Sequence, residues 1–346
     1  MINKDDVLKI LQQIEYPGYK TDIVSFGIVK DVRFIHAEVT VTLDLRTTDE
    51  KIIREIAARI EQKIKTLPDV QTVTVQVLET KSTEQSARKT IPEDAYLPTV
   101  RHKIAVASGK GGVGKSTVSV NLAVALAKVG LKVGLLDSDI YGPSIPLMFG
   151  IKDKPQFDGQ KLLPIEKFGV HLMSLGFLIS DDNPVIWRGP LVMRALQQLM
   201  RDVAWGNLDM MLFDMPPGTG DAQLTLSQSI TLDGAVVVTT PQDVALLDAA
   251  KGVQMFRKVS VPILGIVENM SYFLCPHCST RTDIFSTGGA KRECERLQVE
   301  LLGEIPLDVE IRIGGDEGIP VVQKNPDHPQ SRAFLEIAER IAEKVN

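Results

Sequence analysis

Hydrophobic and polar positions alternate with two different periods in the first part of the chain. Over 3–15 the apolar residues recur on one helical face, namely Val7, Leu8, Leu11 and Ile14. Two strand-like runs follow at 22–32 and 34–45, and the second alternates apolar with polar residues. A helical pattern over about 48–66 and a last strand within 68–79 complete the series. We therefore predict a small α+β domain with the order αββαβ over residues 1–80.

A polar, proline-containing stretch without period, residues 81–99, is typical of a linker. From residue 100 to 346 the pattern changes, and short apolar runs alternate with helical segments. The runs are "HKIAVAS", "KVGLLD", "DMMLFD", "GAVVVTT" and "VPILGIVEN". Short runs without polar residues indicate strands covered on both faces, so we predict an α/β domain with a doubly wound, mainly parallel sheet. The final stretch, 331–346, has one apolar face and balanced charges, which predicts a helix that docks on this sheet.

Composition adds few constraints to this picture. The chain has 346 residues, 44% of them hydrophobic, and a formal net charge of −5, which argues against nucleic acid as the main partner. No apolar run approaches the length of about 18 residues that crosses a bilayer, so we expect no stable membrane insertion. Three cysteines in a chain with no signal-like start argue for a reducing compartment, and we expect a soluble, cytoplasmic protein.

The sharpest local motif lies between the first predicted strand of the large domain and the helix after it. Residues 109–116, "GKGGVGKS", match the phosphate-binding loop G-x-x-x-x-G-K-[ST]. Its glycines let backbone N–H groups face a triphosphate, Lys115 can reach the β- and γ-phosphates, and Ser116 can ligate Mg²⁺. We predict that ATP contacts the whole loop, that is Gly109, Lys110, Gly111, Gly112, Val113, Gly114, Lys115, Ser116 and Thr117.

Lys110 makes this loop resemble the K-G-G-x-G-K-[ST] variant of the MinD/ParA, nitrogenase iron protein and arsenite-pump ATPases. The resemblance implies a homodimer in which Lys110 reaches the nucleotide of the second subunit; a solvated surface lysine is the simpler alternative. Asp137, Asp139 and Asp214 follow at predicted strand ends in the order of the same class. The resemblance implies that Asp137 and Asp214 support Mg²⁺ and that Asp139 orients the attacking water, with Lys110 and Lys115 stabilising the charge that develops.

Residues 268–278, "ENMSYFLCPHC", carry a more specific resemblance. Together with "YGPSIP", "WRGP", "DMPPGTGD", "LGEIPL" and "RIGGDEGIP", they closely resemble the Mrp/ApbC iron–sulfur cluster carrier ATPases over about 100–325. The family implies that Asn269 contacts adenine. It also implies that Cys275 and Cys278 of two chains together hold one [4Fe–4S] cluster, and that this cluster is transferred to apo-proteins, with scaffold proteins as further partners. A homodimer with ATP and Mg²⁺ as cofactors is thus expected to couple slow ATP hydrolysis to cluster carriage.

Other interpretations of the cysteine pair stay open at this point. They include a thioredoxin-like dithiol, zinc held within one chain with Cys294 and His277 as the two further ligands, a zinc site of four cysteines between two chains, and simple buried thiols. An intersubunit zinc site would suit a nucleotide-switched scaffold or a metal-homeostasis regulator with little turnover. Cys294 itself lies in a helical pattern and is expected to be a packing or surface thiol.

The N-terminal region resembles the small domain that precedes many Mrp ATPases, with two departures. The D-P-E triplet of that domain is replaced by Glu15, Tyr16 and Pro17, and its Pro-Ala-Cys-Pro turn has no counterpart in "LRTTDEKIIREI". This copy has no cysteine, so we expect it to dock partners or to position the dimer. Ser279 and Ser286 replace two glycines usual beside the cysteine motif, which does not change the cluster interpretation.

Overall fold

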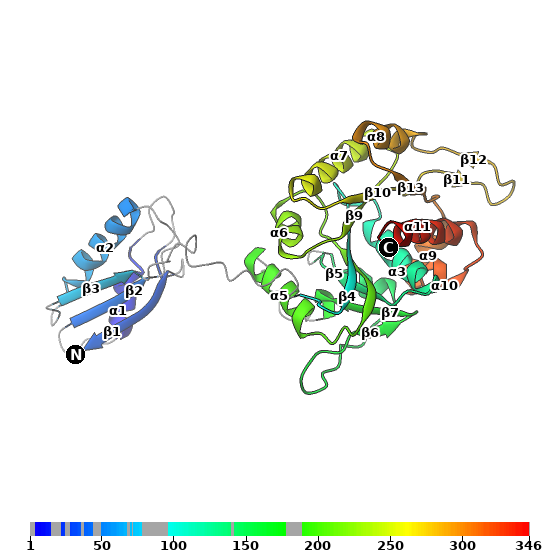
Figure 1. Ribbon diagram of the computed structural model, residues 1–346. Coiled ribbons are helices and arrows are strands. Elements are labelled where there is room, and N and C mark those ends of the chain that lie inside the picture. Colours follow the sequence, from blue (N-terminus) through cyan, green and yellow to red (C-terminus); the bar gives the residue numbers. More distant parts are fainter. Residues whose placement is uncertain are drawn as a thin grey trace. The chain divides into compact units, whose positions relative to one another are not determined.

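The computed structural model divides the chain into two compact units, Met1–Ile91 and Pro92–Asn346 (Figure 1). It describes residues 4–14, 22–24, 28–35, 38–43, 50–67, 70, 72–77, 96–139, 142–177 and 189–345. Residues 81–95 of the predicted linker lie outside the described residues. Of its remaining residues, Leu97 is buried in the core of the large unit. Residues 15–17 and 45–49, where the N-terminal departures fall in part, also lie outside them.

The small unit has the predicted order αββαβ. Its elements are α1 (Lys4–Leu11), β1 (Val29–Ile35), β2 (Glu38–Leu43), α2 (Glu50–Ile64) and β3 (Thr72–Val77). Strand β2 lies in the middle of the sheet, antiparallel to β1 and parallel to β3. Alternate residues of β2 and one face of α2 form the core, which explains the two periods in the sequence.

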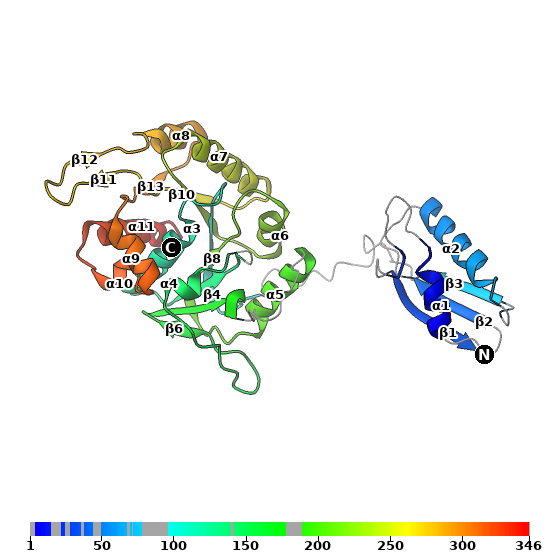
Figure 2. The ribbon, with the colours of Figure 1, turned by 180° about the vertical axis from the view of Figure 1, so that it is seen from behind.

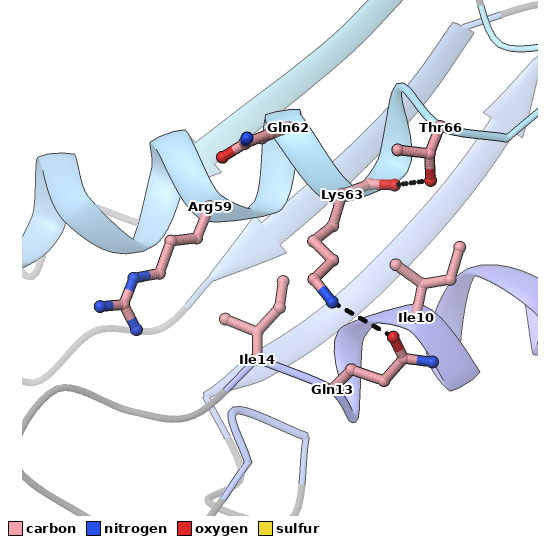
Figure 3. A pocket seen from close by; sticks show the side chains of 7 residues that line it. All are labelled: Ile10, Gln13, Ile14, Arg59, Gln62, Lys63 and Thr66. Atoms are coloured by element: carbon pink, nitrogen blue, oxygen red, sulfur yellow. Dashed lines mark hydrogen bonds between the residues drawn. The ribbon is translucent and has the colours of Figure 1, made fainter.

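An open groove of about 710 Å³ lies between α1 and α2 of this unit (Figure 3). Its lining comprises Ile10, Gln13, Ile14, Arg59, Gln62, Lys63 and Thr66. Lys63 Nζ donates to Gln13 Oε1 at 3.3 Å and so links α2 to the turn that follows α1. The lining therefore combines two isoleucines with cationic, amide and hydroxyl side chains.

The large unit is built on an eight-stranded sheet with the order β13-β10-β9-β4-β8-β5-β7-β6. All neighbours are parallel except β6 and β7, as expected for a doubly wound P-loop sheet. The strands are β4 (Val100–Ala107), β5 (Val133–Asp137), β6 (Ile165–Lys167), β7 (Val170–Ser174), β8 (Leu208–Asp214), β9 (Gly234–Thr239), β10 (Ile263–Glu268) and β13 (Leu301–Glu304). The five predicted apolar runs correspond to β4, β5, β8, β9 and β10.

Helices cover both faces of this sheet. They are α3 (Lys115–Lys128), α4 (Ile145–Met148), α5 (Gly189–Asp202), α6 (Asp221–Ser229), α7 (Asp243–Lys258), α8 (Gly289–Leu297), α9 (Val309–Glu317), α10 (Val321–Lys324) and α11 (Pro329–Val345), with a 3-10 turn at Leu175–Phe177. Figures 1 and 2 show α3 and α11 on one side of the sheet, and α5, α6 and α7 on the other. In α11, Phe334, Ile337, Ala338 and Ile341 are buried, which confirms the docking face read from the sequence.

No helix in the described part of the chain is long and apolar enough to cross a membrane.

A two-stranded hairpin, β11 (Phe273–Leu274) with β12 (Arg281–Thr282), leaves the sheet after β10 and returns at α8. In both ribbon views this hairpin projects from the large unit beyond β10 and β13 (Figures 1 and 2). The segment that carries the two cysteines therefore begins at the carboxyl end of β10, on the same edge of the sheet as the carboxyl ends of the other parallel strands.

Candidate functional site

The phosphate-binding loop joins β4 to α3, and its backbone needs glycine at defined positions. Gly112 and Gly114 have φ +84°, a left-handed conformation that side chains with a Cβ rarely adopt. A Cβ on Gly109 would lie 1.9 Å from the carbonyl oxygen of Asp248 in α7. The loop is thus held against α7 and left open on its outer side, where nothing lies within 4 Å of a Cβ built on Gly112. This cradle fits a chain of phosphates.

Lys115 begins α3 and lies in a buried cluster of charges. Its Nζ is 2.8 Å from Asp214 Oδ2 and 3.7 Å from Asp139 Oδ2. Ser116 Oγ donates to Asp214 Oδ2 at 2.7 Å. The structure therefore brings together the lysine and hydroxyl of the loop and two of the three predicted aspartates.

Asp137 and Asp214 are direct neighbours because β5 and β8 pair in a register that sets them side by side. Asp137 is 1% exposed and accepts hydrogen bonds from Ser174 Oγ at 2.9 Å and from the Asp139 backbone N at 3.1 Å. Burial, and then the negative charge of Asp214, raises the pKa of Asp137 to about 8. Two carboxylates and a serine hydroxyl at one strand edge form an oxygen-rich donor set, which suits Mg²⁺.

Asp139 has one oxygen with no protein partner. The side chain is buried, and Oδ1 makes no hydrogen bond in the described structure. Burial raises the pKa of this carboxyl, although the nearby Lys115 ammonium opposes the shift. A buried acceptor without a partner costs free energy, so a water or ligand donor is expected at Oδ1.

Two serines that the sequence analysis did not single out complete this cluster. Ser119 Oγ donates to Asp214 Oδ1 at 2.6 Å, and Ser174 donates to Asp137. Ser119 lies one turn after Ser116 on α3, so helical spacing could have indicated it. Ser174 lies on β7, and only the register of β5 with β7 brings it to Asp137.

Lys110 is exposed, and no ion pair of its side chain occurs among the described residues. Its backbone oxygen accepts from Ser108 Oγ at 2.9 Å, which fixes the loop backbone and leaves the side chain outside the cluster. Reach into the site of a second subunit remains a prediction. Pro217 lies near the loop, with its Cβ 3.9 Å from a Cβ built on Gly111.

A cavity of about 270 Å³ opens beside the start of α3. Its lining includes Thr117, Asn269, Met270, Pro306 and Leu307. The Asn269 side chain donates from Nδ2 to the Val113 carbonyl oxygen at 2.9 Å, so it holds the phosphate-binding loop from outside. Its contact with adenine, which the resemblance implies, remains a prediction that this position beside the cavity allows.

Cys275 and Cys278 lie in the turn between β11 and β12, where Cys275 is half-buried and Cys278 exposed. The Cys275 backbone N donates to the Thr280 carbonyl oxygen at 3.0 Å. Cys278 Sγ lies 3.1 Å from Thr280 Oγ1, and hydrogen bonds from the Thr280 side chain and backbone lower the pKa of Cys278. A lowered pKa favours the thiolate form, which is the form that binds metals, and the exposed position makes Cys278 accessible.

Cys294 is separate from this pair. It lies in α8, 3% exposed, and burial raises the pKa of its thiol to about 12. No group of three or more His, Cys, Asp or Glu that could hold a metal ion occurs among the described residues, which include 268–345. The arrangement therefore does not support a zinc site within one chain. The turn also opens no helix, which removes the helix N-terminus that a thioredoxin-like thiol needs.

Comparison with known proteins agrees with the geometry. A family model described as NUBPL iron-transfer P-loop NTPase matches residues 99–342. The chain belongs to this family. The model of an iron-sulfur cluster assembly protein domain matches residues 4–77 of the small unit. The resemblance to iron–sulfur carrier ATPases and the doubly wound fold are thereby confirmed.

Two relatives with iron–sulfur names differ in how much of the chain they cover. A Synechocystis protein named iron-sulfur cluster carrier protein is 44% identical over 354 residues, covering 100% of this chain and 99% of its own. An Arabidopsis thaliana protein named iron-sulfur protein required for NADH dehydrogenase, mitochondrial, is 55% identical and covers 71% of this chain and 79% of its own.

Two solved structures share the fold of the large unit. A nucleotide-binding protein from Archaeoglobus fulgidus, in complex with ADP, has a TM-score of 0.61 and 39% identity and covers 70% of this chain and 95% of its own. The cell division ATPase MinD of Pyrococcus furiosus has a TM-score of 0.54 and 27% identity, covering 71% of this chain and 99% of its own. The large unit is thus a P-loop NTPase of the MinD/ParA type.

Proposed function

We propose that two copies of this chain hold one iron–sulfur cluster at their interface and transfer it to apo-proteins. ATP is bound and hydrolysed at the phosphate-binding loop. The position of Cys275 and Cys278 carries the proposal, because both thiols lie in one projecting turn with no third ligand nearby among the described residues. Two chains would supply the four thiolates that a [4Fe–4S] cluster takes. The names of the relatives support iron–sulfur cargo rather than another metal.

The strand-end cluster fits Mg²⁺ with ATP. Ser116 would ligate the ion directly, and Asp137 and Asp214 would hold its water ligands. Bound there, Mg²⁺ supplies positive charge to the β- and γ-phosphates. The Lys115 ammonium, now paired with Asp214, would exchange that carboxylate for phosphate oxygens. The free Oδ1 of Asp139 supports a role in accepting a hydrogen bond from the attacking water.

The proposed reaction is in-line hydrolysis. The water oxygen forms a bond to the γ-phosphorus while the bond to the β–γ bridging oxygen breaks, giving ADP, inorganic phosphate and a proton. Backbone N–H groups of residues 109–116, Lys115 and the Lys110 of a second copy would stabilise the charge on the transferred group. Asn269 would border adenine in the adjoining cavity, and Gly109 to Thr117 would surround the phosphates.

The two units have different roles in this proposal. Residues 1–80 form the small domain, 81–99 the linker, and 100–346 the domain that binds ATP and carries the cluster. The small unit would dock apo-proteins or a scaffold protein. All three cysteines are free thiols, which suits a reducing compartment, and we place the reaction in the cytoplasm.

The experiment is anaerobic reconstitution with iron and sulfide, followed by metal and sulfide analysis. We compare wild type with the Cys275→Ser/Cys278→Ser variant, and use Cys294→Ser as the matched control. Iron and sulfide at about four each per two chains, lost in the double variant and kept in the control, would support the proposal. Zinc as the only bound metal, lost in the same double variant, would favour an intersubunit zinc site on a nucleotide-switched scaffold instead.

A further inference from the structure

A buried carboxylate at the end of β10 has no part in the proposed reaction. Glu268 is 1% exposed. Its Oε1 accepts from Ser271 Oγ at 2.6 Å, and its Oε2 accepts from the backbone N of Ala290 at 3.0 Å. Both carboxylate oxygens thus accept hydrogen bonds from groups of the protein.

The two donors to Glu268 lie on either side of the cysteine hairpin. Ser271 precedes β11, and Ala290 is the second residue of α8, which follows the hairpin. Cys275 and Cys278 lie between them in the sequence. One carboxylate therefore closes the base of the segment that carries both thiols.

The two residues after Glu268 lie beside the phosphate-binding loop and the cavity next to it. Asn269 donates to the carbonyl oxygen of Val113 in the phosphate-binding loop, and Met270 lines the adjoining cavity. Met270 has φ +55°, a left-handed conformation that is uncommon outside glycine and costs free energy. The Leu307 backbone N, beside the same cavity, donates to the Tyr272 carbonyl oxygen at 2.7 Å.

A second set of contacts holds the returning strand of the hairpin. The Arg281 guanidinium lies 4.0 Å from the centroid of the Tyr272 ring, and its Nη1 is 3.5 Å from Glu304 Oε2. The Arg281–Glu304 pair is partly exposed, with 45% and 31% of the two side chains accessible to solvent, and ion pairs near the surface contribute little to stability. The buried bonds of Glu268 are therefore the stronger attachment.

We propose that Glu268 is a positioning residue that ties the cysteine hairpin to the segment 269–272 beside the nucleotide site, so that nucleotide binding at the loop changes the hairpin. The inference rests on the proposed function for its purpose, namely control of how a cluster is held. A shift of the phosphate-binding loop would reach Asn269 through Val113, and the neighbouring carboxylate would pass it to both ends of the hairpin.

Three variants separate positioning from mere folding. Glu268→Ala leaves the Ser271 hydroxyl and the Ala290 N–H without their acceptor. Glu268→Gln can keep both contacts, because its carbonyl accepts from Ala290 and its amide nitrogen donates to Ser271 Oγ. Ser271→Ala removes one contact only. Glu300→Ala is the control, because Glu300 forms an exposed pair with Lys344 outside this network.

The test is hydrogen–deuterium exchange of the full chain without a cluster, with and without MgADP. In wild type and Glu268→Gln, MgADP should slow exchange in peptides covering both 109–117 and 272–289. In Glu268→Ala the hairpin should exchange about tenfold faster without nucleotide, which corresponds to about 1.4 kcal/mol, and should no longer respond to MgADP. Its P-loop should still be protected. Glu300→Ala should behave as wild type, and Ser271→Ala should lose part of the response.

Two results would overturn the inference. One is a hairpin response in Glu268→Ala equal to that of wild type; the other is a wild-type hairpin that ignores MgADP while the P-loop responds. If Glu268→Ala fails to fold, a full wild-type response in Ser271→Ala overturns it, and a reduced response supports it. The exchange experiment uses the cluster-free protein. A failed reconstitution would therefore refute the proposed cluster cargo without affecting the exchange result.

Discussion

Replacing Asp137 with asparagine should stabilise the protein while destroying its nucleotide chemistry. The side chain is 1% exposed and lies beside Asp214. Asparagine has the same shape and no charge, and its two hydrogen bonds can persist if the Ser174 hydroxyl turns to accept from the new amide. The variant therefore removes the electrostatic cost of the carboxyl with little change in packing.

The magnitude follows from proton linkage. The pKa of Asp137 rises from 3.8 to about 8 in the metal-free fold. The stabilising effect of the bound proton is complete below the unfolded pKa and is lost as pH rises toward the folded one. Between about pH 5 and pH 7 the wild type should lose about 1.4 kcal/mol per pH unit from this group. At pH 7 the accumulated loss is about 4 kcal/mol, and Asp137→Asn avoids it.

The assay is urea unfolding at several pH values in the presence of EDTA and without nucleotide. We expect the free energy of unfolding of Asp137→Asn, relative to wild type, to rise steadily from pH 5 to pH 7. The exposed Asp153→Asn variant is the control and should follow the wild-type curve. If the free energies of unfolding of wild type and Asp137→Asn change with pH in parallel, the reasoning is refuted. In a separate assay, Asp137→Asn should show no Mg²⁺-dependent ATP hydrolysis.

Three further predictions follow from single contacts. Lys115→Ala removes the buried ammonium, so phosphate release that saturates with ATP in wild type should vanish; unchanged turnover would contradict the site. Asn269→Ala loses the hydrogen bond to Val113, worth about 1 kcal/mol, so the Kd for MgADP measured by calorimetry should rise about fivefold, and an unchanged Kd would exclude this support. Thr280→Ala should raise the pKa of Cys278 toward its ordinary value, seen as a shift of the alkylation rate to higher pH in the cluster-free protein; an unshifted profile would show that Thr280 has no such effect.

The fold could be predicted because its signals are local. Most residues of the five apolar runs are buried, and every residue of β5 and β9 is buried. The phosphate-binding loop is equally local, since β4, the loop and α3 follow one another. Lys115 and Ser116 could therefore be located from the spacing of the loop motif alone, whereas the role of Asp214 was implied by the family resemblance.

The rest of the site depends on pairings that no local pattern contains. Ser174 reaches Asp137 only through the register of β7 on β5. Glu268 accepts from Ala290, which lies 22 residues later, after the chain has made the hairpin and returned. The family resemblance implies that Asn269 contacts adenine, and the structure adds its hydrogen bond to the Val113 carbonyl oxygen.

The central claim is that one cluster is shared by the cysteines of two chains, and native mass spectrometry of the reconstituted protein under anaerobic conditions tests it most directly. The account predicts a dimer that carries the added mass of one [4Fe–4S] cluster, and no cluster on the Cys275→Ser/Cys278→Ser variant. A cluster on a single chain, or a dimer that keeps its cluster without these two cysteines, would contradict it.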